Sequence, residues 1–335
     1  MLAQMRMPRG GSPLLEAKEL KKSFNGTRAL DGLSFAVQQG ELFGFLGPNG
    51  AGKTTTINVL TGLARPDSGL IWIGGVDCSR NPKTAQRLIG VVPDESNLYP
   101  ELTGFENLCF SGALYGMKKH DRQTRALELL DAFRLTDAAD RKFAGYSRGM
   151  KRKLTIAAGI IHRPPILFLD EPTTGIDVAS ARQIRQLIGD LHRAGTTIFL
   201  TTHYIEEAER LCDRIAFIVS GQIVRIDTVA ELLQPIHQRH VMLFSVSLFS
   251  TDLIGVLTST FPALGFDTLA GNNQIRVESD VPIRVGPLVR FFEERGIEVT
   301  EARRMQPSLE DVFVRITGIE ADAMRREKEK AGGSV

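Results

Sequence analysis

A glycine-rich segment early in the chain has the composition of a loop that binds phosphate. It reads Gly-Pro-Asn-Gly-Ala-Gly-Lys-Thr over residues 47–54 and matches the pattern G-x-x-x-x-G-K-[ST] in full. Glycines allow backbone N–H groups to converge on phosphate oxygens, a lysine adds charge beside the β- and γ-phosphates, and a threonine hydroxyl can bind Mg²⁺. We therefore predict that ATP is bound by Gly47, Pro48, Asn49, Gly50, Ala51, Gly52, Lys53, Thr54 and Thr55, with Thr54 also on the metal.

Two adjacent carboxylates supply the second half of the same chemistry. Asp170 and Glu171 follow the apolar run Ile-Leu-Phe-Leu of residues 166–169. In ATPases that have this phosphate loop, the first carboxylate holds Mg²⁺, directly or through water. The second can orient the attacking water or accept its proton. We predict Asp170 as a metal ligand and Glu171 as a catalytic residue, although a strand that ends in a polar turn would look the same on its own.

These motifs must be positioned by a sheet whose faces are covered by helices. An apolar run at residues 42–46 leads into the glycine-rich loop, and a helix should follow from Lys53. Strands that alternate with helices favour a mostly parallel sheet. The other predicted elements are two strands within residues 14–37, strands at 166–169, 197–201 and 215–219, and a helical insertion at about 98–150.

The order of these motifs resembles that of the ABC ATPase family. Between the phosphate loop and the carboxylates lies Tyr146-Ser147-Arg148-Gly149-Met150, at the place of that family's signature L-S-G-G-Q. Ser147 and Gly149 match the signature, whereas Tyr146, Arg148 and Met150 depart from it. The resemblance implies an α/β fold, namely the P-loop NTPase cassette of the ABC type, with a mixed sheet core and a helical subdomain.

The signature helix of the family faces the γ-phosphate of an ATP molecule held by the opposite subunit. The resemblance therefore implies that Ser147, Arg148 and Gly149 contact nucleotide across a dimer of two copies of this chain. Arg148 would add a positive charge to that phosphate. On the residues alone, a serine followed by a helix also reads as an N-cap.

Three more positions take their predicted roles from the resemblance. Asp177 lies just after the carboxylates, in the place of the loop that crosses between subunits. His203 ends a strand where the family has a switch histidine on the γ-phosphate, so we predict it to be catalytic. Phe24 stands where the family stacks an aromatic ring on adenine. The alternatives are a structural histidine and a phenylalanine of the core.

Asp94 is the sharpest departure from the family pattern. It lies in a segment, residues 91–95, where the family normally has a glutamine that touches Mg²⁺ and reports the nucleotide state to the membrane subunit. A carboxylate is still a good ligand for a hard metal ion, so we predict Asp94 to contact the metal and the nucleotide. Its extra negative charge should weaken ATP binding unless Mg²⁺ or Arg148 compensates for it.

The last third of the chain is predicted to be a separate, small domain. We expect the ATP-binding domain at residues 14–235, an α+β accessory domain at 236–318, a flexible N-terminus at 1–13 and a disordered charged tail at 319–335. The phrase Met-Gln-Pro-Ser-Leu-Glu-Asp-Val-Phe at residues 305–313 resembles the close of subunits from drug-resistance and nodulation-factor exporters. It reads equally as an ordinary amphipathic helix.

Composition limits the classes of function that remain. The chain has 335 residues and a formal net charge of only +2, so we expect no nucleic acid partner. The short basic cluster at residues 151–153 reads as a solvated face. Three cysteines without metal or disulfide spacing fit a reducing cytoplasm. No apolar run approaches the ~18–20 residues of a membrane-spanning helix.

These observations predict an ATP-hydrolysing subunit of an ABC transporter, most simply of an exporter. Its expected partners are a second copy of itself and a separate, multispanning membrane permease, and its expected place is the cytoplasmic face of the inner membrane. ATP and Mg²⁺ are the expected cofactors. Two alternatives remain open: an ABC ATPase without a transport role, and an ATP-regulated module that hydrolyses ATP weakly.

Overall fold

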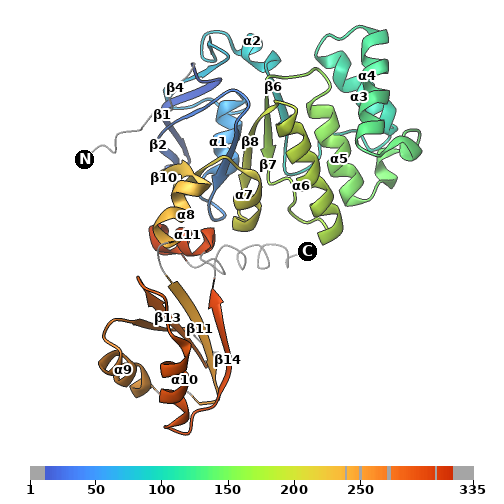
Figure 1. The fold of residues 1–335 in the computed structure, drawn as a ribbon. Coiled ribbons are helices and arrows are strands. Elements are labelled where there is room, and N and C mark those ends of the chain that lie inside the picture. The colour runs from blue at the N-terminus through green and yellow to red at the C-terminus, as the bar shows by residue number, and fades with distance from the viewer. Residues whose placement is uncertain (1–11, 238–239, 249–250, 270–272, 306–307, 320–335) are drawn as a thin grey trace. The chain divides into compact units, whose positions relative to one another are not determined.

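The computed structural model describes residues 12–237, 240–248, 251–269, 273–305 and 308–319 (Figure 1). The chain divides into two compact units, and the second of them is Val229–Arg315. The sequence had placed this boundary at residue 235, inside what the structure shows as helix α8 (Val229–His237). The units divide earlier because the last strand of the core sheet ends at Thr228, where the chain leaves its neighbour. The predicted flexible N-terminus and charged tail lie almost entirely outside the described residues.

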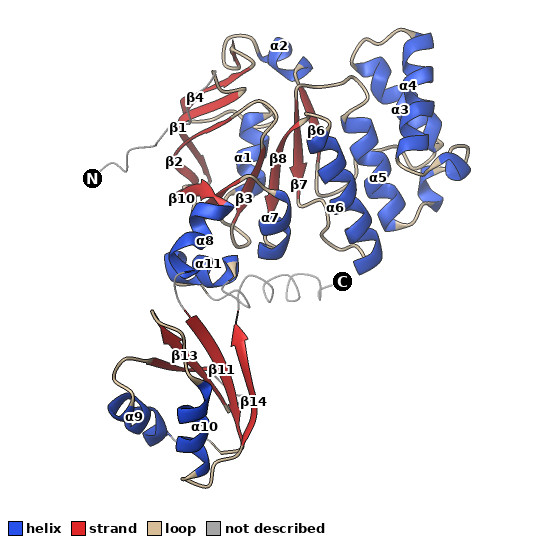
Figure 2. Ribbon diagram, in the orientation of Figure 1, coloured by secondary structure: helices blue, strands red, loops and turns tan. Residues whose placement is uncertain are grey.

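The first unit contains a six-stranded mixed sheet, ordered β10-β9-β3-β8-β7-β6, and a four-stranded antiparallel sheet, ordered β2-β1-β4-β5 (Figure 2). In the larger sheet all neighbours are parallel except β10 and β9, so the predicted mixed core is confirmed. The strands are β1 (Leu15–Phe24), β2 (Thr27–Val37), β3 (Leu42–Leu46), β4 (Ser68–Ile73), β5 (Val76–Asp77), β6 (Ile89–Val92), β7 (Ile166–Asp170), β8 (Thr197–Thr202), β9 (Arg214–Val219) and β10 (Gln222–Thr228).

The core of this unit lies between the two sheets and around the first helix. Alternate residues of each buried strand point to one face. There they form a cluster of phenylalanine rings whose centroids lie 5.4 to 5.9 Å apart. This packing holds the ends of β3, β7 and β8 side by side, at the edge where the predicted chemical residues lie. The rings belong to Phe35, Phe43, Phe45, Phe168 and Phe199.

A group of helices interrupts the strand–helix alternation (Figure 1). α3 (Gly104–Leu114) begins with a capping box between Thr103 and Glu106, and it packs on α4 (Lys119–Ala132) and on α5 (Arg148–Gly159). The predicted insertion therefore contains α3 and α4, while α5 starts at its end and continues to Gly159. The other helices of this unit are α1 (Lys53–Leu60), α2 (Pro82–Arg87), α6 (Val178–Arg193), α7 (Ile205–Leu211) and two short 3-10 helices (Thr136–Ala138, Phe143–Gly145).

The second unit is a small α+β domain with an antiparallel sheet ordered β12-β13-β11-β14. One face of the sheet packs on α9 and α10 through Phe244, Ile275, Val277, Leu257 and Phe292. The element order of strand, helix, two strands, helix, strand and helix is the one predicted. After α8, which also belongs to this unit, its elements are β11 (His240–Val246), α9 (Thr251–Thr260), β12 (Gly265–Leu269), β13 (Gln274–Ser279), α10 (Val285–Glu293), β14 (Val299–Met305) and α11 (Leu309–Thr317).

Two further sequence predictions meet the structure here. The basic cluster at residues 151–153 is not simply a solvated face, because the Arg152 side chain is only 7% exposed. It lies on the side of α5 that the core covers, together with Thr155 and Ile156 one turn later. No helix in the described part of the chain is both long enough and apolar enough to cross a membrane.

Candidate functional site

The glycine-rich loop connects the end of β3 to the first turn of α1, as predicted. A Cβ atom at Gly47 would lie 2.2 Å from the carbonyl oxygen of Ile218, so only glycine fits there. Gly50 and Gly52 have φ angles of 76° and 105°, in the left-handed region that favours glycine. The position of a Cβ at Gly50 has nothing within 4 Å, so the main chain of the loop is open on that side.

Lys53 lies at the start of α1 with its side chain 5% exposed. Its ammonium group donates to the carbonyl oxygens of Gly47 at 2.8 Å and Pro48 at 3.0 Å, and it lies 3.3 Å from Glu171 Oε1. The loop and the second carboxylate are thus joined by one cation. Thr54 is exposed and Thr55 is half-buried on the same turn, while Asn49 is half-buried and Ala51 buried within the loop.

Asp170 and Glu171 lie at the carboxyl end of β7, next to the end of β8. The Thr201 hydroxyl donates to Asp170 Oδ1. The N–H of Glu171 donates to the carbonyl oxygen of Thr201 at 3.1 Å and to its hydroxyl at 3.2 Å. Glu171 adopts a φ of 44°, which is strained for a residue with a side chain. These bonds hold Glu171 in that conformation.

The Glu171 carboxylate is shared among several groups. Besides Lys53, it accepts from the Thr174 hydroxyl at 2.9 Å and lies 3.0 Å from His203 Nδ1. Because a carboxylate can only accept, Nδ1 must carry the hydrogen. His203 is 5% exposed and follows β8 directly. In the structure, the Glu171 carboxylate therefore contacts both Lys53 and His203.

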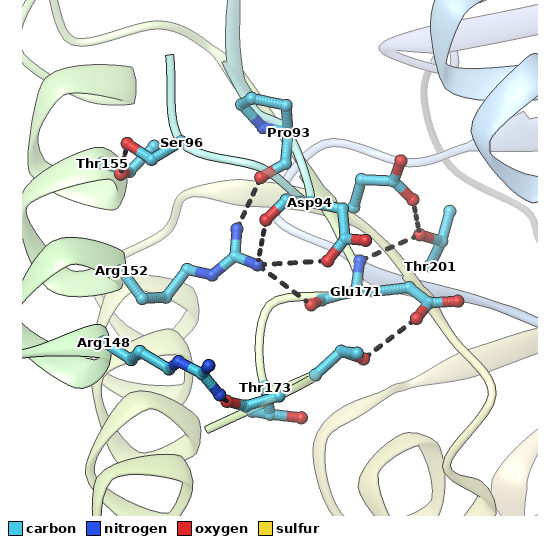
Figure 3. Close-up of polar contacts among 12 residues, drawn as sticks. Pro93, Asp94, Ser96, Arg148, Arg152, Thr155, Glu171, Thr173 and Thr201 are labelled. Atoms are coloured by element: carbon cyan, nitrogen blue, oxygen red, sulfur yellow. Dashed lines mark hydrogen bonds and ion pairs between the residues drawn. The ribbon is translucent and has the colours of Figure 1, made fainter. Parts of the chain in front are cut away.

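Arg152 was missed as a site residue by the sequence, and it ties three segments together (Figure 3). Its guanidinium donates to the carbonyl oxygens of Pro93 at 2.5 Å, Asp94 at 2.7 Å and Glu171 at 3.3 Å. It also lies 3.5 Å from the Asp94 carboxylate, which is 46% exposed. Burial lowers the pKa of Arg152, and the nearby carboxylates, Asp94 first, oppose that shift. Asp94 thus joins the site through Arg152.

Two residues of the signature segment, Arg148 and Gly149, lie against residues 175–180 of the same chain. Ser147 caps α5, accepting from the N–H of Met150 at 3.3 Å. Arg148 donates to the carbonyl oxygen of Gly175 at 3.3 Å, and a Cβ on Gly149 would lie 2.5 Å from the Ser180 hydroxyl oxygen.

Two predicted nucleotide contacts lie at other element ends. Asp177 is the N-cap of α6 and accepts from the Ser180 N–H at 2.9 Å. Phe24 ends β1 with 49% of its surface exposed, and the Lys22 ammonium lies 5.1 Å from its ring centroid. Phe24 is therefore not a core residue, which was the alternative; stacking on adenine remains a proposal.

The residues present fit a triphosphate with Mg²⁺. The loop presents a conformation that only glycines adopt, followed by a helix start and a buried lysine, which is an anion-binding arrangement. Thr54 and Asp170 offer a hydroxyl and a carboxylate, the hard oxygen ligands that Mg²⁺ prefers. Mg²⁺ takes few ligands from such proteins and completes its shell with phosphate oxygens and water.

The chain is similar to known proteins over most of its length. The family model described as ABC transporter matches residues 30–174. The chain is 35% identical to the linearmycin resistance ATP-binding protein LnrL of Bacillus subtilis over 91% of this chain and 98% of the relative. It is 38% identical to the daunorubicin/doxorubicin resistance ATP-binding protein DrrA of Streptomyces peucetius over 94% and 95% of the two chains. The chain belongs to the ABC transporter ATP-binding family.

Other members of the ABC family match in sequence and in structure. Nod factor export ATP-binding protein I of Ralstonia nicotianae is 35% identical over 93% of this chain and 96% of its own. The solved ATP-binding subunit of an ABC transporter has a TM-score of 0.61 and 32% identity, covering 67% of this chain and 93% of its own. An ABC cassette solved as a dimer has a TM-score of 0.59 and 28% identity, covering 64% and 98%.

Membership decides between the functions that the sequence left open. The ABC family is a family of ATP-hydrolysing transporter subunits, and the full-length matches are named as ATP-binding proteins of drug resistance or of Nod factor export. This protein is therefore an ATP-binding, ATP-hydrolysing ABC subunit. The alternatives of an ABC ATPase without a transport role and of a weakly hydrolysing module are not favoured.

Proposed function

We propose that this ABC subunit powers an exporter, by ATP- and Mg²⁺-driven closure of two copies on a separate membrane permease. The observation that carries the proposal is the contact of Lys53 and His203 with one carboxylate, Glu171, beside the glycine loop. Support for export comes from relatives over nine-tenths of the chain that are described as drug-resistance and Nod factor export proteins.

In this proposal the γ-phosphate of ATP replaces Glu171 as the partner of Lys53. The phosphate carries more negative charge than a carboxylate and meets the N–H groups of residues 47–52 at the same time. Glu171, released from Lys53, then orients the attacking water and accepts its proton. His203 holds the carboxylate in place through Nδ1 and turns its other nitrogen to the phosphate. Thr54 and Asp170 would hold Mg²⁺, which would supply positive charge beside the phosphate oxygens.

Each chain has one glycine loop and one signature segment, so a complete site is proposed to need two copies. Ser147, Arg148 and Gly149 of one copy would face the phosphates held by the other. Loss of the γ-phosphate on hydrolysis removes contacts that only the closed state makes, and the pair opens. We place the subunit at the cytoplasmic face of the inner membrane, where a multispanning permease would hold it.

ATP-driven dimerisation tests the proposal. Full-length Glu171→Gln should bind MgATP without turnover and elute as a dimer, and it should remain a monomer when Lys53 is also changed to Ala. Glu206→Gln is the matched control, because this residue lies on α7 with its side chain 74% exposed. Glu206→Gln should hydrolyse ATP at the wild-type rate. A Glu171→Gln protein that stays monomeric in MgATP and turns over normally would refute the proposal.

A further inference from the structure

Arg152 is a buried cation whose hydrogen bonds end on the loops that follow β6 and β7 (Figure 3). It is 7% exposed, and it reaches from α5 to the carbonyl oxygens of Pro93 and Asp94 on one loop and of Glu171 on another. A second contact joins the same helix to the first loop, between the hydroxyls of Thr155 and Ser96 at 2.8 Å. One face of α5 is therefore bound to the loop of residues 93–96 by two of its side chains.

Simple packing does not account for this side chain. A buried charge loses solvation that its partners must replace, and an apolar side chain of similar size is often at least as stabilising. The planar fork of arginine can hold several carbonyl groups in one geometry, which neither lysine nor an apolar residue can do. The arrangement therefore favours a role in fixing the relative position of the two loops.

The neighbouring basic residues do not share these partners. Arg148 donates to Gly175, Lys153 donates to Gln183 at 2.7 Å, and the Lys151 ammonium lies 5.5 Å from the Phe143 ring centroid. The sequence had offered Mg²⁺ or Arg148 as the group that compensates for the charge of Asp94. Within one chain the group beside Asp94 is Arg152, whose guanidinium lies 3.5 Å from the Asp94 carboxylate.

We propose that Arg152 is a positioning residue for ATP hydrolysis, which fixes the main chain of Glu171 relative to the Asp94 loop and neutralises the charge of Asp94. The proposal rests on the proposed role of Glu171 in activating water. Glu171 has a strained φ, so its main chain depends on its hydrogen bonds to keep this conformation. Loss of the bond to its carbonyl oxygen would shift the main chain and, with it, the Glu171 carboxylate. The helix that begins with the signature thereby sets the geometry of the catalytic carboxylate.

The first test separates turnover from binding in the full-length protein. Arg152→Gln should lower kcat roughly 10- to 100-fold, because small misplacements of a catalytic group have effects of that size. Its Kd for MgATP should weaken by no more than about fivefold, because the carboxylate left without its partner, Asp94, is half-exposed to water. Lys151→Gln, which removes the same charge one position earlier on α5, should keep the wild-type kcat.

The second test uses Asp94. In the Arg152→Gln background, Asp94→Asn should restore the affinity for MgATP, because it removes the charge that was left uncompensated. It should not restore kcat, because the carbonyl groups of Pro93 and Glu171 still lack their donor. In the wild-type background Asp94→Asn should change the affinity less. This non-additivity is the expected mark of a direct pair.

The outcomes that overturn the inference are distinct from failure of the proposed function. If Arg152→Gln turns over like Lys151→Gln while Glu171→Gln is inactive, Arg152 has no positioning role. Should Arg152→Gln fail to fold, Arg152→Lys keeps charge and bulk but not the fork, and it should retain the wild-type melting temperature with a lowered kcat. Wild-type turnover by Arg152→Lys would also overturn the inference. Normal hydrolysis by Glu171→Gln would instead sink the proposed function.

Discussion

At the scale of single residues, Arg148 stands where the family signature has a glycine. Arg148 donates a hydrogen bond of 3.3 Å to the carbonyl oxygen of Gly175. This bond is exposed to solvent and its acceptor is neutral, so the bond adds little to the stability of one chain. An exposed arginine beside the N-terminus of α5 can turn to a phosphate of a second copy at low cost. Its predicted role across the dimer therefore remains a proposal that the structure permits.

Arg148→Ala should weaken ATP-dependent dimerisation without unfolding the monomer. In the Glu171→Gln background we expect the dimer dissociation constant in MgATP to rise by about fivefold, the value of an exposed charge contact. Sedimentation equilibrium measures this dissociation constant. Arg163→Ala is the control, since that arginine follows α5 in the chain and its side chain is 74% exposed. Equal dimerisation of Glu171→Gln with and without Arg148→Ala would rule out the trans contact.

Residue identity predicted the glycine loop, Lys53 and the carboxylate pair, because their chemistry depends on types and spacing that a sequence shows directly. It did not predict that Arg152 lies between them. A basic residue flanked by Lys151 and Lys153 looks solvated, and its partners are main-chain carbonyl groups, which no sequence pattern marks. One signal was available: Arg152 comes three residues after Gly149 and four before Ile156, on the buried face of α5.

At the scale of elements, α5 and α6 approach closely because Gly149 has no side chain. A Cβ there would lie 2.5 Å from Ser180 Oγ and 2.7 Å from Ser180 Cβ. The match of Gly149 to the signature therefore has a packing reason within one chain, in addition to any contact with nucleotide. The sequence could not separate these reasons, because the partner of Gly149 lies on another helix.

Gly149→Ala should destabilise the fold by about 1–3 kcal/mol through overpacking. Adding Ser180→Gly should restore most of this loss, because the next atom, Ser180 Cα, is 3.9 Å away. Urea denaturation of the two variants measures it, and Gly145→Ala, which meets nothing closer than 4.0 Å, is the control. Wild-type stability of Gly149→Ala would show that the helices do not need this glycine.

His162 joins three elements after the end of α5. Its Nε2 donates to the carbonyl oxygen of Ile89 at 3.0 Å, and its ring stacks on Tyr115 with centroids 3.4 Å apart. Burial lowers the pKa of His162 to about 4, against 6.5 for the free side chain. The unfolded chain therefore binds more protons between these values, and the contribution of this histidine is present above pH 6.5 and lost as the pH falls towards 4.

The melting temperature should consequently fall less steeply with acid in His162→Gln than in wild type. The difference should be confined to the window from pH 6.5 to about 4. His120→Gln, at an exposed position on α4, should follow the wild-type profile. Parallel profiles for all three proteins would show that His162 is not the group that titrates.

At the scale of the whole molecule, the predicted elements come together because parallel strands place their carboxyl ends at one edge of a sheet. Lys53 follows β3, Asp170 ends β7 and His203 follows β8, which are neighbours in the sheet order. Strand–helix alternation and the motif order were sufficient to predict this. The second unit begins directly after Thr228, where pairing with β9 ends, whereas the sequence pattern led us to expect a boundary at residue 235.

The most direct test of the account is MgATP binding and hydrolysis by the full-length protein and by Lys53→Ala. We expect wild type to bind and hydrolyse MgATP and to stop hydrolysis when EDTA removes the metal. Lys53→Ala should bind at least about tenfold more weakly, because a charge-assisted contact to phosphate is lost, and it should not turn over. Equal binding and hydrolysis by Lys53→Ala and wild type would contradict the account.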